Sequence, residues 1–274
     1  VILFKKGGET VHPVALNLLK NSIALALLIT TMLLLGETLR FEAPPDHYLL
    51  MISGGVLGIS LSDTLFFKSL NLLGASRMAI VDCLYSPFII LLSVFFLDET
   101  LSWLQFLGVL AIVGAVLTPL FEARGAPVEG RRVAWGTLWG AVALATMAVS
   151  LVAVKPVLNQ SPVLWSACMR MAGGLLGLVV YLACHPGRGK ILKTLRGPGL
   201  KFSALGSVVG GYVAMMLWLG GMKYTQASVA AALNQTTNVF IFILAAWVLK
   251  EAITRQRAVG ILLGVGGAIL VTFC

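Results

Sequence analysis

Residues 54–76 read GGVLGISLSDTLFFKSLNLLGAS, and residues 206–228 read GSVVGGYVAMMLWLGGMKYTQAS. The two stretches begin one gap-free alignment, in which 54–121 pairs with 206–273 at an offset of 152 residues. Of these 68 positions 17 are identical, about a quarter, where unrelated sequences of this composition would share roughly a tenth. The identical pairs include Gly54/Gly206, Gly58/Gly210, Ala75/Ala227, Ser76/Ser228, Phe88/Phe240, Glu99/Glu251, Gly108/Gly260 and Gly114/Gly266. The chain therefore contains an internal duplication.

The composition indicates a membrane protein. Hydrophobic residues make up 58% of the 274 residues and charged residues only 11%, against about a quarter charged in soluble domains. This excludes a soluble enzyme, a disordered protein and a secreted disulfide scaffold, because a soluble surface needs more polar side chains. The net charge of +9 comes from Lys and Arg in short segments between apolar runs, so it does not indicate nucleic-acid binding. The four cysteines and three histidines are scattered, and we predict no metal, no cofactor and no catalytic residue.

Apolar runs of about twenty residues, the length that crosses a bilayer, recur along the chain. We predict nine complete spans, at about 14–35, 48–70, 77–97, 102–121, 134–154, 162–184, 202–222, 227–249 and 256–273. Runs of this length in lipid are helices, because the backbone must satisfy its own hydrogen bonds there. The opening residues 1–6 are too short to cross, and we interpret them as the last turn of a truncated first helix. The predicted fold class is an all-α integral membrane protein of ten-helix design, with nine complete spans and a stump of the first.

The duplicated unit holds five helices, which is an odd number. An odd number of crossings inserts the second copy upside down, so we predict two inverted five-helix repeats. Transporters use this architecture to open alternately to either side of the membrane around a central site. The predicted boundaries are 1–121 for the first repeat, 122–133 for the linker and 134–274 for the second repeat.

Several motifs resemble a known family. The first repeat carries Gly74-Ala75-Ser76, Pro87, Leu97-Asp98-Glu99-Thr100-Leu101, Gln105, Gly108 and Gly114, and the second carries Ala227-Ser228, Lys250-Glu251-Ala252-Ile253, Gly260 and Gly266. In this register both halves resemble the EamA-type repeat of the drug/metabolite transporter superfamily. The resemblance implies a secondary transporter, usually an exporter of amino acids or other small metabolites in prokaryotes. Val239 stands where the first repeat has Pro87, so we expect a helix kink in one half only. The truncated first helix is a second departure, which leaves open whether the chain is a complete functional unit.

Polar residues inside the spans are the candidate substrate and translocation pathway, since ionisable groups in lipid are costly and often functional. Asp82 and Ser86 share a helix face, and their repeat counterparts Asn234 and Asn238 do the same. The full set of candidates is Asp63, Asp82, Tyr85, Ser86, Arg170, Tyr212, Asn234, Gln235 and Asn238. A carboxylate among them is a candidate carrier of coupling protons.

Structural interpretations compete with these roles. Asp82 lies at a level similar to Lys68 and near Arg77, so a structural ion pair would explain its charge. Asn234 and Asn238 are candidates for hydrogen bonding between helices, and Arg170 for snorkelling to a helix end.

We interpret two repeat-related motifs as structural. We expect Glu99 and Glu251 to anchor the helices that follow them, with Ser102 and Thr254 as N-caps. The GxxxG pairs, such as Gly54/Gly58 and Gly206/Gly210, predict close helix packing.

The sequence predicts a multi-pass transporter in the inner (plasma) membrane that exports a small metabolite such as an amino acid, and no enzyme. The alternatives are an exchanger of sugar phosphates or nucleotide sugars, an integral-membrane enzyme, and a structural membrane subunit. Fourteen of the 20 Lys and Arg residues fall on one predicted side, which places the C-terminus outside. The family resemblance implies the opposite orientation, so both stay open, as do the substrate, the coupling ion and the oligomeric state.

Overall fold

The fold was obtained as a computed structural model that describes residues 1–38, 42–96, 102–122 and 127–273. Within these residues the chain is helical and contains no strand. Six helical segments are long and apolar enough to cross a membrane, namely Pro13–Leu34, Pro45–Leu73, Ala75–Phe96, Val128–Gln160, Val163–Cys184 and Leu200–Tyr224. Shorter apolar helices cover Trp103–Thr118 and Thr236–Leu249. The described residues are thus helical and consistent with a membrane protein, while the ten-helix plan stays a prediction.

The helices form two compact units, and each unit draws on both halves of the chain. Unit 1 consists mainly of 3–67 and 149–224. Its helices are α1 (Ile2–Gly8), α2 (Pro13–Leu34), α3 (Pro45–Gly55), η1 (Val56–Ser62), the start of α4 (Asp63–Leu73), the end of α8 (Pro127–Gln160), α9 (Val163–Cys184), α10 (Arg188–Lys193), η2 (Thr194–Arg196), α11 (Leu200–Gly206), η3 (Ser207–Val213) and α12 (Ala214–Tyr224).

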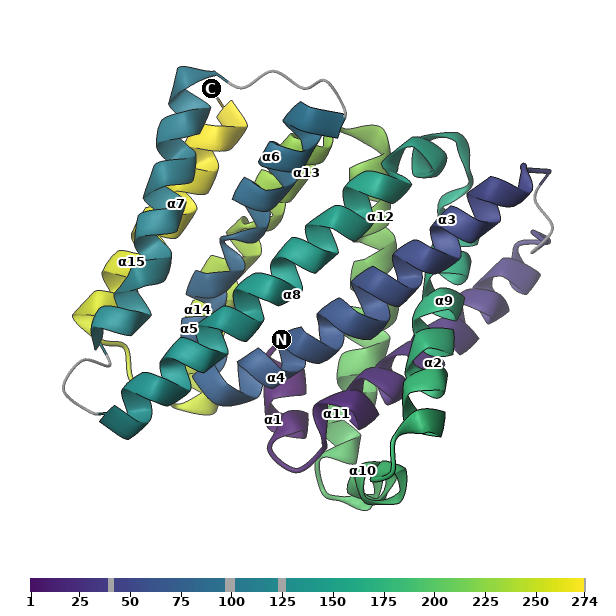
Figure 1. Cartoon of the computed structure of the whole chain (residues 1–274), viewed down its shortest axis with the longest axis horizontal. Helices are drawn as coiled ribbons and strands as arrows, with labels where there is room; N and C mark the ends of the chain where they lie inside the picture. Colours follow the sequence, from purple (N-terminus) through teal and green to yellow (C-terminus); the bar gives the residue numbers. More distant parts are fainter. Residues whose placement is uncertain (39–41, 97–101, 123–126, 274) are drawn as a thin grey trace. The chain divides into compact units, whose positions relative to one another are not determined.

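Unit 2 consists of 68–148 and 225–274. Its helices are the rest of α4, α5 (Ala75–Asp82), α6 (Tyr85–Phe96), α7 (Trp103–Glu122), the first part of α8, α13 (Ala227–Asn234), α14 (Thr236–Leu249) and α15 (Arg255–Phe273). Figure 1 shows α7 and α15 side by side, and they pack along their whole lengths.

Unit 1 contains two π-helical segments at matching places in the duplication. Segment η1 covers Val56–Ser62, and η3 covers Ser207–Val213. Segment η3 therefore begins one residue earlier than the 152-residue offset would place it. A π-helix is rare, because it widens the turn and weakens the backbone packing, and it is frequent at functional sites. Segment η1 packs on α9 and η3 packs on α2, which are also counterparts.

Unit 2 contains two interrupted helices, again at matching places. Helix α5 ends at Asp82 and α6 begins at Tyr85, while α13 ends at Asn234 and α14 begins at Thr236. In the first repeat Pro87 lacks the N–H that would bond the Cys83 carbonyl, which accounts for a break one turn earlier. The expectation of a kink in one half only is wrong, since the second repeat breaks at Gln235 without a proline.

Small residues allow the close packing that the GxxxG pairs predict. Val154 packs on Gly54, and Phe4 packs on Gly206 and Gly210. A side chain at any of these glycines would meet its neighbour at or below normal contact distance. Close approach at these glycines is confirmed, and it serves packing between helices.

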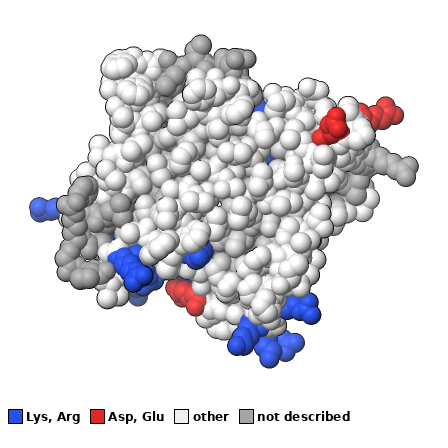
Figure 2. Space-filling view, in the orientation of Figure 1, with Lys and Arg blue, Asp and Glu red and all other residues white. Residues whose placement is uncertain are grey.

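Few charged side chains reach the visible surface (Figure 2). Figure 2 shows Lys and Arg gathered near α10, while most of the remaining visible surface carries no charge. The exposed cations of this segment are Arg188, Lys190, Lys193 and Arg196. Exposed leucine, valine and phenylalanine side chains cover much of the other helices, as a lipid-facing surface requires.

Candidate functional site

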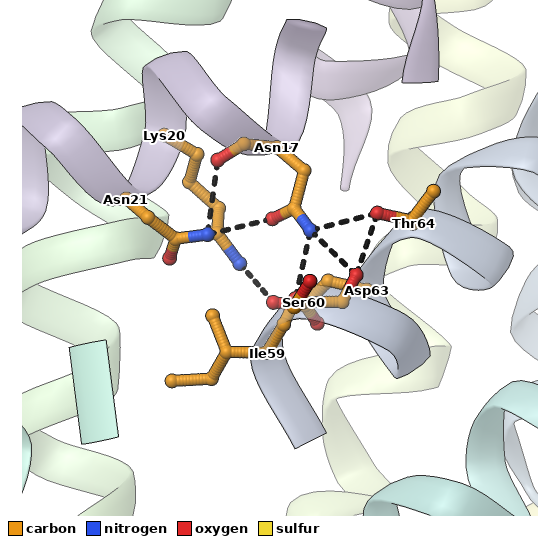
Figure 3. Close-up of polar contacts among 7 residues, drawn as sticks. All are labelled: Asn17, Lys20, Asn21, Ile59, Ser60, Asp63 and Thr64. Atoms are coloured by element: carbon orange, nitrogen blue, oxygen red, sulfur yellow. Dashed lines mark hydrogen bonds and ion pairs between the residues drawn. The ribbon is translucent and has the colours of Figure 1, made fainter. Parts of the chain in front are cut away.

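A buried ion pair lies in the interior of unit 1. The ammonium of Lys20 on α2 contacts the carboxylate of Asp63, the first residue of α4 (Figure 3). The two side chains are 8% and 15% exposed. Lys20 Nζ also lies 5.6 Å from the centre of the Phe67 ring. The two opposite charges neutralise each other, which is the condition for burying both of them.

Polar side chains around this pair hold the end of the π-helical segment. The Asn17 amide donates to the carbonyls of Ile59 (2.7 Å) and Ser60 (3.3 Å) and to Thr64 Oγ1 (3.0 Å). The wide turns of η1 displace carbonyls from their usual partners, and Asn17 supplies a replacement donor. Asn21 in turn donates to Asn17 Oδ1 at 2.8 Å. Figure 3 shows α2 placing Asn17, Lys20 and Asn21 toward the same short segment.

Two other predicted residues also belong to unit 1. Arg170 on α9 is 1% exposed and donates to Ser150 Oγ at 3.3 Å. Its guanidinium therefore lies inside the helix bundle, and the snorkelling interpretation is wrong. Tyr212 in η3 shares a hydrogen bond of 2.5 Å with Thr31 of α2. Arg170 and Tyr212 thus contact Ser150 and Thr31, respectively.

The other six candidates belong to unit 2 and gather where its helices break. Asn238 is fully buried, and its amide donates to Gln235 Oε1 at 2.5 Å and to Cys83 Sγ at 3.7 Å. The Asn238 side chain also lies beside the Asp82 carboxylate. Asp82, Cys83, Gln235 and Asn238 thus form one polar cluster, which we call the break cluster.

The break cluster keeps unsatisfied hydrogen-bonding capacity. Within the residues that the structure describes, Gln235 Nε2, Asn238 Oδ1 and the nearby Ser86 Oγ are buried and have no hydrogen-bond partner. Buried polar groups without partners are costly, so an ordered water or a bound molecule is expected to satisfy them. Tyr85 is buried in the first turn of α6, and Asn234 is half-buried at the end of α13.

The ion pairs expected for Asp82 do not form. Lys68 lies over the Trp139 ring, with Nζ 3.8 Å from its centre. Arg77 donates to Glu129 Oε1 at 2.9 Å. Asp82 instead lies beside the neutral amide of Asn238 in the second repeat.

Glu251 is a structural anchor, but for a different helix from the one expected. Its carboxylate accepts from the backbone N–H groups of Ala75 (2.7 Å) and Ser76 (2.9 Å) and from the Ser76 hydroxyl (2.5 Å). It therefore caps α5 rather than α15. Gly74 precedes this cap with φ of 86°, and a side chain there would press on the Glu251 carboxylate.

The predicted N-caps are confirmed. Thr254 Oγ1 accepts from the Arg257 N–H, and Ser102 Oγ accepts from the Gln105 N–H. Glu99 lies outside the described residues.

His12 precedes α2 and caps it through Nδ1, which accepts from the Val14 N–H at 3.3 Å. Burial lowers the pKa of His12, and the nearby His185 lowers it further. An imidazole that accepts at Nδ1 is unprotonated at that atom, so the capping contact and the lowered pKa agree. Among the described residues no three His, Cys, Asp or Glu side chains are placed to hold a metal ion.

These features define a multi-pass, all-helical membrane protein with polar groups inside its helix bundles. The EamA-like transporter family matches residues 1–120 and 134–273, and the chain belongs to that family, within the drug/metabolite transporter superfamily. It is therefore a membrane transporter that lies in a lipid bilayer and takes a small molecule as substrate, in a family of transporters rather than enzymes.

The fold also occurs in a solved structure titled "Crystal structure of protein". The two share 21% sequence identity with a TM-score of 0.71, over 99% of this chain and 93% of that one. This likeness shows the fold alone. No curated protein matches the sequence.

Sequence reasoning missed Lys20 as the partner of Asp63 and overlooked Asn17 and Asn21. A signal was present, because residues 17, 20 and 21 occupy one face of a predicted span. Three polar residues on one face of an apolar helix indicate a buried polar contact. The identity of the partner helix could not be read from that pattern.

Proposed function

We propose that the chain is a secondary-active transporter that exports a small metabolite, such as an amino acid, across the inner (plasma) membrane. It works by alternating access between two inverted five-helix repeats, 1–121 and 134–274, joined by the linker 122–133. The break cluster of unit 2 contacts the substrate. Transport of this kind needs a polar site inside the membrane and a helix arrangement that can open on either side.

The packing of counterpart helices supports the inverted repeats. In unit 2 helix α5 packs on α14 and α13 packs on α6, so the first half of each interrupted helix meets the second half of the other. Helices α7 and α15 also run in opposite directions, since Gly260 lies at Thr118 and Gly267 lies at Gly108. Counterpart helices of inverted repeats run in opposite directions.

One observation carries the assignment of the substrate site, namely that both helix breaks fall at positions related by the duplication. Cys83 and Gln235 are 152 residues apart, the offset of the repeat. Interrupted helices in transporters expose backbone groups and helix ends for the substrate. Here they coincide with buried polar groups that lack partners in the described part of the chain, at Gln235 and Asn238.

Counterflow in proteoliposomes tests the proposal. Vesicles holding the purified protein are loaded with one unlabelled compound from a panel of amino acids and small metabolites, and uptake of its labelled form is followed. We expect one compound class to exchange, and Gln235→Leu to abolish the exchange while Thr237→Val, at an exposed neighbouring position, preserves it. Folding of each variant is checked by its elution as a single species in detergent. Equal exchange by wild type and Gln235→Leu would place the substrate elsewhere.

A further inference from the structure

The segment between α9 and α11 of unit 1 gathers positive charge. It contains α10, η2 and the start of α11, and we call residues 188–201 the basic connector. In Figure 2 Lys and Arg side chains project from the surface near α10. The chain contains neither Asp nor Glu from residue 130 to residue 250, so the sequence offers no acid in the connector or in the helices on either side of it. The five cations of the connector are all exposed, and they are Arg188, Lys190, Lys193, Arg196 and Lys201.

The neighbouring elements do not neutralise this charge. Both α10 and η2 pack on α2, whose sequence contains no acid. Lys5 and Lys6 on α1 are half-buried, and Lys6 Nζ lies 5.4 Å from the centre of the Phe202 ring of α11. The turn between α1 and α2 contributes one acid, the exposed Glu9. Positive charge therefore dominates this part of unit 1.

Hydrogen bonds hold the connector to the turn between α1 and α2. The His12 N–H donates to Thr194 Oγ1 at 3.1 Å, and the Gly199 N–H donates to Thr10 Oγ1 at 3.2 Å. Gly199 also approaches α1 closely, since a Cβ there would lie 2.6 Å from the Gly7 carbonyl oxygen. The cations thus extend from a fixed backbone, which reduces the ordering entropy that a ligand must overcome.

Exposed apolar side chains alternate with these cations. Leu192 in α10 is 40% exposed, and Leu200 and Phe202 in α11 are 38% and 41% exposed. Each of the three is adjacent in sequence to a lysine of the connector. Such a mixture is unfavourable in water, but it suits the boundary of a bilayer, where charged headgroups meet acyl chains. It favours a phospholipid over a nucleic acid or a soluble anion, because only the lipid also covers the apolar side chains.

We propose that the basic connector binds the headgroups of anionic phospholipids, such as phosphatidylglycerol, at the surface of the bilayer. Its Lys and Arg side chains donate charge-assisted hydrogen bonds to the phosphate oxygens. Clusters of about four to eight such residues next to a membrane span are attracted to anionic lipid in this way. The apolar side chains between them contact the upper part of the acyl chains. Lipid binding here belongs to unit 1 and does not depend on the transport proposed for the break cluster of unit 2.

Native mass spectrometry of the purified protein in detergent tests the headgroup preference. The protein is titrated with phosphatidylglycerol or with phosphatidylcholine of identical acyl chains, and the lipid-bound species are counted. We expect phosphatidylglycerol to bind more tightly, because the choline ammonium neutralises the phosphate. Lys190→Gln/Lys193→Gln should weaken its binding about fivefold for each removed cation, whereas Lys190→Arg/Lys193→Arg should retain it.

A charge-matched control separates the connector from general electrostatic attraction. Arg131→Gln/Arg255→Gln removes the same charge from exposed positions of unit 2 and should bind phosphatidylglycerol as wild type does. Arg196→Gln/Lys201→Gln supplies a second connector pair, which should weaken binding like the first. Each variant is checked for elution as a single species. Equal binding of the two lipids by wild type, or equal weakening in the unit 2 control, would overturn the proposal.

Competition separates a lipid site from a site for soluble phosphate. Glycerophosphoglycerol, which is the same headgroup without acyl chains, and inorganic phosphate are added to the lipid-bound protein at constant ionic strength. We expect neither to displace an equal concentration of phosphatidylglycerol. Leu192→Asn should weaken lipid binding, while Val128→Asn, at an exposed apolar position of α8, should not. Displacement by either soluble phosphate, or unchanged binding in Leu192→Asn, would contradict the lipid assignment.

Discussion

At the scale of single residues, buried charges in this chain find partners that sequence proximity does not identify. Arg77 was expected near Asp82 but bonds Glu129, and Lys68 lies over Trp139. Sequence separation and span depth predict which residues are inside the membrane. They do not predict which helices are neighbours, and that decides the partner of each charge. Sequence therefore identifies Asp63 and Asp82 as embedded acids, but it does not identify Lys20 as the partner of Asp63.

Glu251 gives a prediction about stability. Its carboxylate accepts three hydrogen bonds at the start of α5, two of them from backbone N–H groups. Glu251→Gln keeps the shape but removes the charge, so we expect a loss of about 1–3 kcal/mol. Thermal unfolding in detergent measures it, with exposed Glu9→Gln as a control that should unfold like wild type. An unchanged unfolding temperature for Glu251→Gln would show that the cap carries no stability.

Asp82 gives a prediction about substrate affinity. It is the one acidic member of the break cluster, where it lies beside the Asn238 side chain. Removal of a charge-assisted contact with the substrate costs about 1.5–3 kcal/mol, so Asp82→Asn should raise the half-saturating concentration in counterflow by about tenfold or more. Asp46→Asn serves as control. Equal affinity in Asp82→Asn and wild type would remove Asp82 from the substrate site.

His12 gives a prediction about pH. Its pKa is lowered in the folded protein, so the unfolded chain takes up the proton first as the pH falls. The stabilising contribution is therefore complete above the ordinary histidine pKa of about 6.5 and is lost progressively below it. Thermal unfolding between neutral and mildly acidic pH should show this loss, and His12→Asn, which retains a capping oxygen, should reduce the slope. Identical slopes in the two proteins would assign the pH effect to another group.

At the scale of elements, the helices follow the hydrophobic pattern but their irregularities do not. The predicted span 48–70 corresponds to a continuous helical segment from Pro45 to Leu73, yet its central π-helical turns left no recognisable sequence signal. The break at Cys83 follows from Pro87. The break at Gln235 has no proline after it, so the signal that marks the first break is missing there.

Gly173 tests how tightly these elements pack. A Cβ at this position of α9 would overlap the Ile52 carbonyl group of α3, which cannot move away without shifting the helix. We expect Gly173→Ala to lower the free energy of unfolding by about 1–3 kcal/mol. Gly114→Ala is the matched control, since nothing lies within 4 Å of its Cβ and alanine favours helix. A Gly173→Ala protein as stable as wild type would mean that α3 and α9 pack less closely.

At the scale of the whole molecule, the sequence repeat and the compact units divide the chain differently. The repeat divides it near its middle, whereas each compact unit takes helices from both halves. Self-alignment detects duplicated sequence. It does not show which helices of the two copies become neighbours in space. The membrane class and the transporter family could be predicted because composition and motifs specify them directly. The grouping of Asp63 with unit 1 and Asp82 with unit 2 could not.

The most direct test of alternating access asks whether the break cluster can be reached from both sides of the membrane. Ser86 is fully buried beside the break in the first repeat, and cysteine replaces its hydroxyl oxygen with a single sulfur atom. The native cysteines are replaced by serine or alanine, and Ser86→Cys is introduced into that background. A membrane-impermeant thiol reagent is then applied to one face of sealed vesicles or to the other. We predict labelling from both faces, slowed by the transported compound. Labelling from a single face, or from neither under transport conditions, would contradict the account.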